Sequence, residues 1–97
     1  MSQSVILDEE ASDIPSDDVL NNDSHNLSAE VDSTNSDIHL KFSSKEAMRD
    51  FAKSILHESY YGSGEIEFYP LISDGKAHVV DGVRLTEDSK RVFVWCK

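Results

Sequence analysis

The side chains that could do chemistry in this 97-residue sequence are one cysteine, four histidines and a pair of glutamates. Cys96 is the penultimate residue and has no histidine near it in sequence, so nothing is expected to hold a base beside its thiol. Glu65 and Glu67 would point to one side of a strand, as half of an acid–base pair would, but a solvated strand face explains them better. The histidines are spread singly, without the spacing of metal ligands, at His25, His39, His57 and His78. We therefore predict no catalytic residues, no metal site and no cofactor, and a protein that is not an enzyme.

Phe93 and Trp95 are candidates for binding. They alternate with apolar residues in a strand that we expect over residues 90–96. If the aliphatic side of this strand faces the core, both rings lie on the open face of the sheet, near Arg91 and Tyr69. Aromatic rings beside a cation can stack on nucleotide bases or anchor a protein partner. The opposite arrangement, with both rings in the core, is equally consistent with the sequence.

All of the net charge lies in residues 1–37. This stretch contains ten acidic residues and no lysine or arginine, whereas residues 38–97 contain nine acids and nine bases. All eight aromatic residues and all four glycines also lie after residue 37. A uniformly charged segment without aromatic residues has too little apolar surface to offset the entropy of ordering it. We therefore predict a disordered acidic tail over residues 1–37 and a small folded domain over residues 38–97.

Short apolar clusters recur among the acids of the predicted tail. Acidic and apolar residues alternate in this way in many disordered segments that dock onto basic partners with apolar grooves. A solubilising tail with scattered aliphatic residues is the alternative. The residues that we expect to contact a partner are Val5, Ile6, Leu7, Asp8, Glu9, Glu10, Asp13, Asp17, Asp18, Phe93 and Trp95.

The run Val5-Ile6-Leu7-Asp8-Glu9-Glu10 resembles the SUMO-interacting motif. In that motif a short aliphatic strand adds to the edge of a sheet, and the carboxylates that follow it meet basic residues. The resemblance covers six residues. It implies an adaptor that presents this segment to a ubiquitin-like partner.

The folded domain is expected to begin with a strand and a helix. Polar and apolar residues alternate over residues 37–42, which predicts the strand. Ser43 and Glu46 then form a capping box that starts the helix. Gly62 is expected to end the helix in the left-handed conformation. The apolar positions of the helix recur at helical spacing and are Ala47, Met48, Phe51, Ala52, Ile55 and Leu56.

The rest of the domain is predicted to consist of strands and turns. A strand over residues 65–69 continues past Pro70, which marks an edge position or a bulge. Asp74-Gly75 predicts a hairpin. Asp81-Gly82 is either a second hairpin or a glycine bulge, and we expect the bulge because the flanking strands would otherwise be very short. The predicted fold class is α+β, with the order β-α-β-β-β and one helix packed on an antiparallel sheet of about four strands.

Cysteine content and hydropathy set the expected environment. A single cysteine excludes an intrachain disulfide and fits a reducing compartment. The sequence contains no run typical of a signal peptide or of a membrane-spanning helix. We therefore expect a soluble intracellular protein without membrane contact, cytoplasmic or, in a eukaryotic cell, nuclear. A homodimer is also plausible, because a unit of about 60 residues buries only a modest core.

Two functions fit these features. The first is a non-enzymatic interaction module or inhibitor whose acidic residues engage a basic protein surface, in the way that nucleic-acid mimics occupy a nucleic-acid-binding site. The second is a single-stranded nucleic-acid-binding sheet that its own acidic tail regulates. The electroneutral domain weighs against the second, because affinity for phosphates requires an excess of lysine and arginine.

Overall fold

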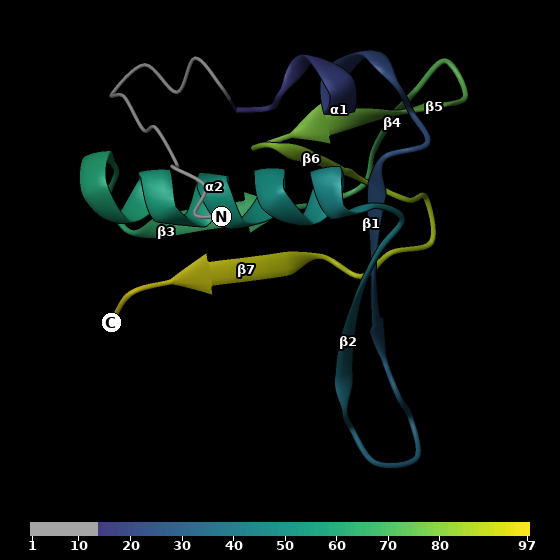
Figure 1. The fold of residues 1–97 in the computed structure, drawn as a ribbon. Helices are drawn as coiled ribbons and strands as arrows, with labels where there is room; N and C mark the ends of the chain where they lie inside the picture. Colours follow the sequence, from purple (N-terminus) through teal and green to yellow (C-terminus); the bar gives the residue numbers. More distant parts are fainter. Residues whose placement is uncertain (1–13) are drawn as a thin grey trace, which may run out of the picture.

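A single long helix packs against two β-sheets in the computed structural model, which describes residues 14–97 (Figure 1). The elements are α1 (Asp17–Asn21), β1 (Asn26–Val31), β2 (Ile38–Phe42), α2 (Lys45–Tyr61), β3 (Glu65–Phe68), β4 (Leu71–Ser73), β5 (Lys76–Val80), β6 (Val83–Leu85) and β7 (Val92–Trp95). Five strands form one sheet in the order β2-β1-β6-β5-β4, and β3 pairs with β7 in a second sheet. The α+β class is confirmed. The prediction of one antiparallel sheet is wrong, because β1 and β6 are parallel and β3 and β7 pair separately.

The aromatic core lies between α2 and the two sheets. The ring of Phe51 on α2 stands 5.3 Å from the ring of Phe42 and 4.6 Å from that of Phe68, measured between centroids. Leu27 from β1 and Leu85 from β6 are fully buried in the same cluster. The helix therefore connects the two sheets through one shared core.

The prediction of disorder up to Asp37 is wrong for residues 17–31. These residues form α1 and β1, and β1 is a central strand of the larger sheet. Leu27 and Ala29 are buried, and β1 pairs with β2 from Leu27↔Phe42 to Val31↔Ile38. The predicted boundary after Asp37 therefore falls at the end of a hairpin loop. Residues 1–13 lie outside the described residues, and disorder there stays a prediction.

Buried Arg84 fixes the segment around α1. Strand β6 is buried on both sides. The guanidinium of Arg84 donates to backbone carbonyls within α1 and just after it. Its Nη1 donates to the carbonyls of Val19, Asn22 and His25 at 2.8, 2.7 and 3.1 Å, and its Nη2 donates to that of Leu20 at 3.2 Å. The last carbonyls of a helix have no partner within the helix, so a cation is favourable there. One arginine thus ties the N-terminal segment to the sheet.

Asp50 holds the other end of α1. It is 2% exposed, and its Oδ2 accepts hydrogen bonds from the backbone N–H and the hydroxyl of Ser16 at 2.8 and 2.9 Å. Ser16 is also the N-cap of α1, because its Oγ accepts from the N–H of Val19. The carboxylate therefore docks the start of α1 onto α2.

The start of α2 differs by one residue from the prediction. Ser44, not Ser43, is the N-cap, and its Oγ accepts from the N–H of Ala47 at 3.1 Å. Ser43 instead bonds to the chain before β1, donating to the carbonyl of Ser24 and accepting from the N–H of Asn26. The contacts with β1 decide which of the two adjacent serines caps the helix.

The buried face of α2 is rotated from the predicted one. Ala47 and Phe51 are buried as expected, but Met48 and Leu56 are 53% and 40% exposed, and Ala52 is exposed too. Two polar residues, Asp50 and Ser54, take their place in the interior. Ser16 covers Asp50, and Gly82 packs closely against Ser54. A Cβ added to Gly82 would lie 3.0 Å from the Ser54 side chain. Gly62, which ends the helix, is extended and not left-handed, with φ −106°.

Both Asp-Gly pairs form two-residue hairpins. Asp74-Gly75 joins paired residues Ser73 and Lys76, which confirms that prediction. Asp81-Gly82 joins Val80 to Val83 in the same way, so the expected bulge is wrong. All four turn residues have positive φ, as a type I′ turn requires. The strands beside Asp81-Gly82 can be short because β6 is held on its other edge by β1.

Candidate interaction surface

Phe93 and Trp95 lie on the open face of β7. Their side chains are 59% and 60% exposed, whereas Val92 and Val94 pack against the core. The structure thus selects one of the two arrangements that the sequence left open. Both rings are free to make contacts with another molecule.

Two glutamates stand directly opposite these rings on β3. Glu65 pairs with Trp95 and Glu67 pairs with Phe93 across the antiparallel ladder, and side chains of such opposed residues share one face. We call these four residues the acidic–aromatic face. The sequence indicated the two rings and the two glutamates separately. It did not show that they lie on one face, because strand pairing is a tertiary property.

Arg91 is the cation beside the acidic–aromatic face. It forms an ion pair with Glu67, and its guanidinium lies over the rings of Tyr69 and Phe93, at 5.7 and 5.4 Å from their centroids. Glu65 has no ion pair in the described part of the chain. The guanidinium of Arg91 is therefore already paired with a carboxylate of this face.

The turn before β6 adds to the negative charge near this face. Burial, followed by the negative charges of Glu58 and Glu67, raises the pKa of Asp81 above its ordinary value. The smaller part of this shift, which Glu58 and Glu67 cause, is repulsion between like charges. A positively charged partner would relieve that repulsion.

A hollow lies under the β1–β2 hairpin. The hairpin has one apolar face, which is buried at Leu27 but continues outward to Val31 and Ile38, 52% and 73% exposed. This exposed end forms one wall of a groove of about 230 Å³, and the start of β7 forms the other. We call this the hairpin groove; its walls are Val31, Ile38 and Leu40 on one side and Lys90, Arg91 and Phe93 on the other. Its volume is below the range of about 300–1,000 Å³ that is usual for small-molecule pockets.

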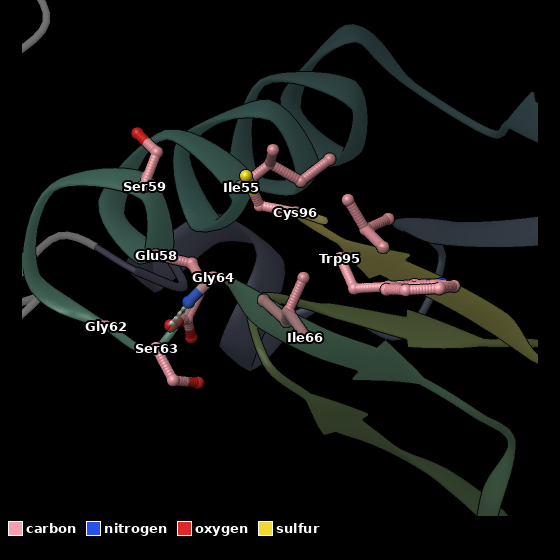
Figure 2. A pocket seen from close by; sticks show the side chains of 10 residues that line it. Ile55, Glu58, Ser59, Gly62, Ser63, Gly64, Ile66, Trp95 and Cys96 are labelled. Carbon is pink, nitrogen blue, oxygen red and sulfur yellow. Dashed lines mark hydrogen bonds between the residues drawn. The ribbon is translucent and has the colours of Figure 1, made fainter.

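Another hollow, of about 360 Å³, lies where α2 ends (Figure 2). Figure 2 shows Ile55, Ile66 and Trp95 around it, with the Glu58 carboxylate turned toward the backbone of Gly64. Glu58 accepts a hydrogen bond from the Gly64 N–H at 3.1 Å. Cys96 borders the same hollow and is exposed, but no histidine from residues 14–97 lines it. Nor do the described residues bring three or more histidine, cysteine or acidic side chains together as metal ligands would be.

The remaining predicted contact residues are not gathered at one place. Asp17 and Asp18 are exposed in the first turn of α1, which lies on the opposite side of α2 from β7 (Figure 1). Val5 to Glu10 and Asp13 lie outside the described residues. Val31, Ile38 and Leu40, which are exposed on the hairpin, were not among the predicted contact residues, although the alternation over residues 26–31 and 38–42 was a signal for an apolar strand face there.

Comparison with known proteins identifies no family for this chain. No family model matches the chain, and no curated protein or solved structure is significantly similar to it. The described helices include none long and apolar enough to cross a membrane. The fold and surface define a small α+β domain with an exposed acidic–aromatic face. The functional interpretation therefore rests on the residues of that face.

Proposed function

We propose that this protein is a non-enzymatic interaction module that engages a basic surface of a partner protein through its acidic residues. The observation that supports this proposal is the acidic–aromatic face. It presents two exposed rings in register with two carboxylates. This combination of an apolar anchor and acidic neighbours is complementary to a surface rich in lysine and arginine.

The two kinds of residue would contribute differently to binding. Trp and Tyr rings dominate the free energy of many interfaces once they are desolvated, and Trp95 offers the largest exposed ring here. The carboxylates would accelerate association, since the chain carries a formal net charge of −10 and long-range attraction steers an oppositely charged partner. Asp8, Glu9, Glu10, Asp13, Asp17 and Asp18 would add to this steering. A partner that itself binds nucleic acid would be inhibited by such occupation.

Binding of single-stranded nucleic acid by the same face is the less favoured function. Glu65 and Glu67 stand beside both rings, so phosphates that follow stacked bases would be repelled. Arg91, the cation that lies over Phe93, is paired with Glu67. The adaptor function implied by the resemblance of Val5 to Glu10 depends on residues outside the described part of the chain.

Affinity capture with the full-length chain tests the proposal. Immobilised protein is incubated with nuclease-treated extract of its source cells, and the variant Trp95→Ala is compared with the wild type. We expect the wild type to retain a basic protein, and the variant to bind it at least 30-fold more weakly, the equivalent of a hot-spot loss of about 2 kcal/mol.

Met48→Ala is the matched control, because Met48 is an exposed apolar side chain on α2 and should not affect retention. Two results would count against the proposal. One is retention only from extract that has not been treated with nuclease, and the other is equal retention by Trp95→Ala and the wild type.

A further inference from the structure

The exposed apolar end of the hairpin suggests that something covers it. Val31 and Ile38 face the same side as buried Leu27 and Phe42, but the body of the protein ends before it reaches them. Ile38 is 73% exposed on an outer strand, β2, whose second edge is unpaired in the described sheet. An exposed apolar strand edge is a template for pairing with another chain segment.

The charges around the hairpin groove indicate what kind of segment fits. Lys90 and Arg91 stand on one wall; Arg91 is paired with Glu67, whereas Lys90 makes no ion pair with any described residue. The opposite wall contains one acid, Glu30, which is paired with Lys41 at 2.8 Å. An aliphatic segment followed by carboxylates would therefore match both the apolar floor and the basic rim.

The chain contains such a segment outside its described residues. Residues Val5-Ile6-Leu7 are aliphatic, and Asp8-Glu9-Glu10 follow directly. In an extended conformation Val5 and Leu7 point to the same side, so both can enter a groove while the carboxylates reach its rim. We propose that the hairpin groove binds residues Val5–Glu10 of a second copy of this chain.

A second copy, rather than the same molecule, is favoured by where the described chain begins. Ile14 contacts Gly82 and lies on the α1 side of α2, whereas β7, which borders the groove, lies on the other side (Figure 1). To fill its own groove, the chain before Ile14 would have to pass around α2. The segment of a second copy does not need that path. Reciprocal exchange of the two segments gives a closed, two-fold symmetric dimer.

Sedimentation equilibrium of the full-length chain over a wide concentration range tests the inference. The wild type is expected to show a monomer–dimer equilibrium. Val5→Ser/Leu7→Ser removes the segment's apolar contacts, and Ile38→Ser removes those of the groove. Each variant should weaken dimerisation at least about tenfold, because each loses aliphatic burial worth that much or more. Far-UV circular dichroism and thermal melts confirm that Ile38→Ser, a change at an exposed position, is folded.

Mixing the two variants makes the test specific. Ile38→Ser retains an intact segment and Val5→Ser/Leu7→Ser retains an intact groove, so the mixture should form a heterodimer held by one contact. Leu20→Ser, at an exposed apolar position on α1, should dimerise like the wild type.

Three results would overturn the inference: a wild type that stays monomeric, dimerisation that is insensitive to Val5→Ser/Leu7→Ser, or no heterodimer in the mixture. The second would mean that two grooves meet face to face. The inference does not depend on the proposed function, and absence of a basic partner would leave all of these results unchanged.

Discussion

Replacing Arg84 by alanine is expected to lower the free energy of unfolding by about 3 kcal/mol. The change removes a buried guanidinium and its hydrogen bonds to the carbonyls of residues 19, 20, 22 and 25, of which the Asn22 carbonyl keeps a second donor, the His25 N–H. Hydrogen bonds to a charged group contribute about 1.5–3 kcal/mol each and are not additive, and we expect a total of about 3 kcal/mol because the unpartnered Nε of Arg84 offsets part of the loss. Chemical denaturation measures the loss.

Amide hydrogen exchange locates the effect of Arg84→Ala. Protection of the residues from Val19 to Val31 should fall first, because Arg84 ties this segment to β6. Arg91→Ala is the matched control, since the Arg91–Glu67 pair is exposed and such pairs contribute about 0–1 kcal/mol. If Arg84→Ala costs no more than Arg91→Ala, or if residues 19–31 exchange freely in the wild type, the N-terminal segment is not docked as described.

Replacing Phe51 by alanine is expected to cost about 3–5 kcal/mol, the usual range for a buried phenylalanine. Phe51 lies between Phe42 and Phe68 and connects α2 with both sheets, so the cavity cannot be closed by the movement of one element. Domains of this size have small net stability, so a loss of this size is enough to unfold the variant at ordinary temperatures.

Phe51→Leu keeps the experiment informative in that case, because it leaves a smaller cavity and its unfolding can still be measured. Met48→Ala, on the exposed side of the same helix, should change stability by less than about 0.5 kcal/mol. A denaturant midpoint for Phe51→Ala close to that of Met48→Ala would show that this side of α2 is not the core.

Local sequence signals located the second half of the chain well. Helical spacing predicted α2, alternation predicted β2 and β3, and Asp74-Gly75 predicted a hairpin that the structure contains. These features depend on residues close in sequence. The choice between Ser43 and Ser44 as cap depended on contacts with β1, which no local pattern includes.

The N-terminal half shows why charge misled the interpretation. Residues 26–31 alternate polar and apolar, with Leu27 and Ala29 buried, but the surrounding acids made the stretch look unable to fold. Those acids cost little because Asp17, Asp18, Asp23, Glu30 and Asp37 are exposed. The partners that order this segment are Asp50 and Arg84, each more than 30 residues away in sequence. Charge density alone therefore did not determine where order begins.

The candidate surface could be predicted only in part. The sequence identified Phe93 and Trp95, but it left open which face of their strand is buried. Glu65 and Glu67 were assigned to a solvated strand face until the pairing of β3 with β7 placed them opposite the rings. Strand register is a long-range property, and it places the two rings and the two carboxylates on one face.

The central claim is that carboxylates of the acidic–aromatic face attract a basic partner. The most direct measurement is the association rate constant, at low and at physiological salt, between the captured partner and Glu65→Gln/Glu67→Gln. A matched variant, Glu87→Gln/Asp88→Asn, removes the same charge from an exposed turn. We predict that association slows several-fold more for the first variant than for the second, and that the difference shrinks as salt screens the charges. Equal association rates for the two variants at low salt would contradict the claim.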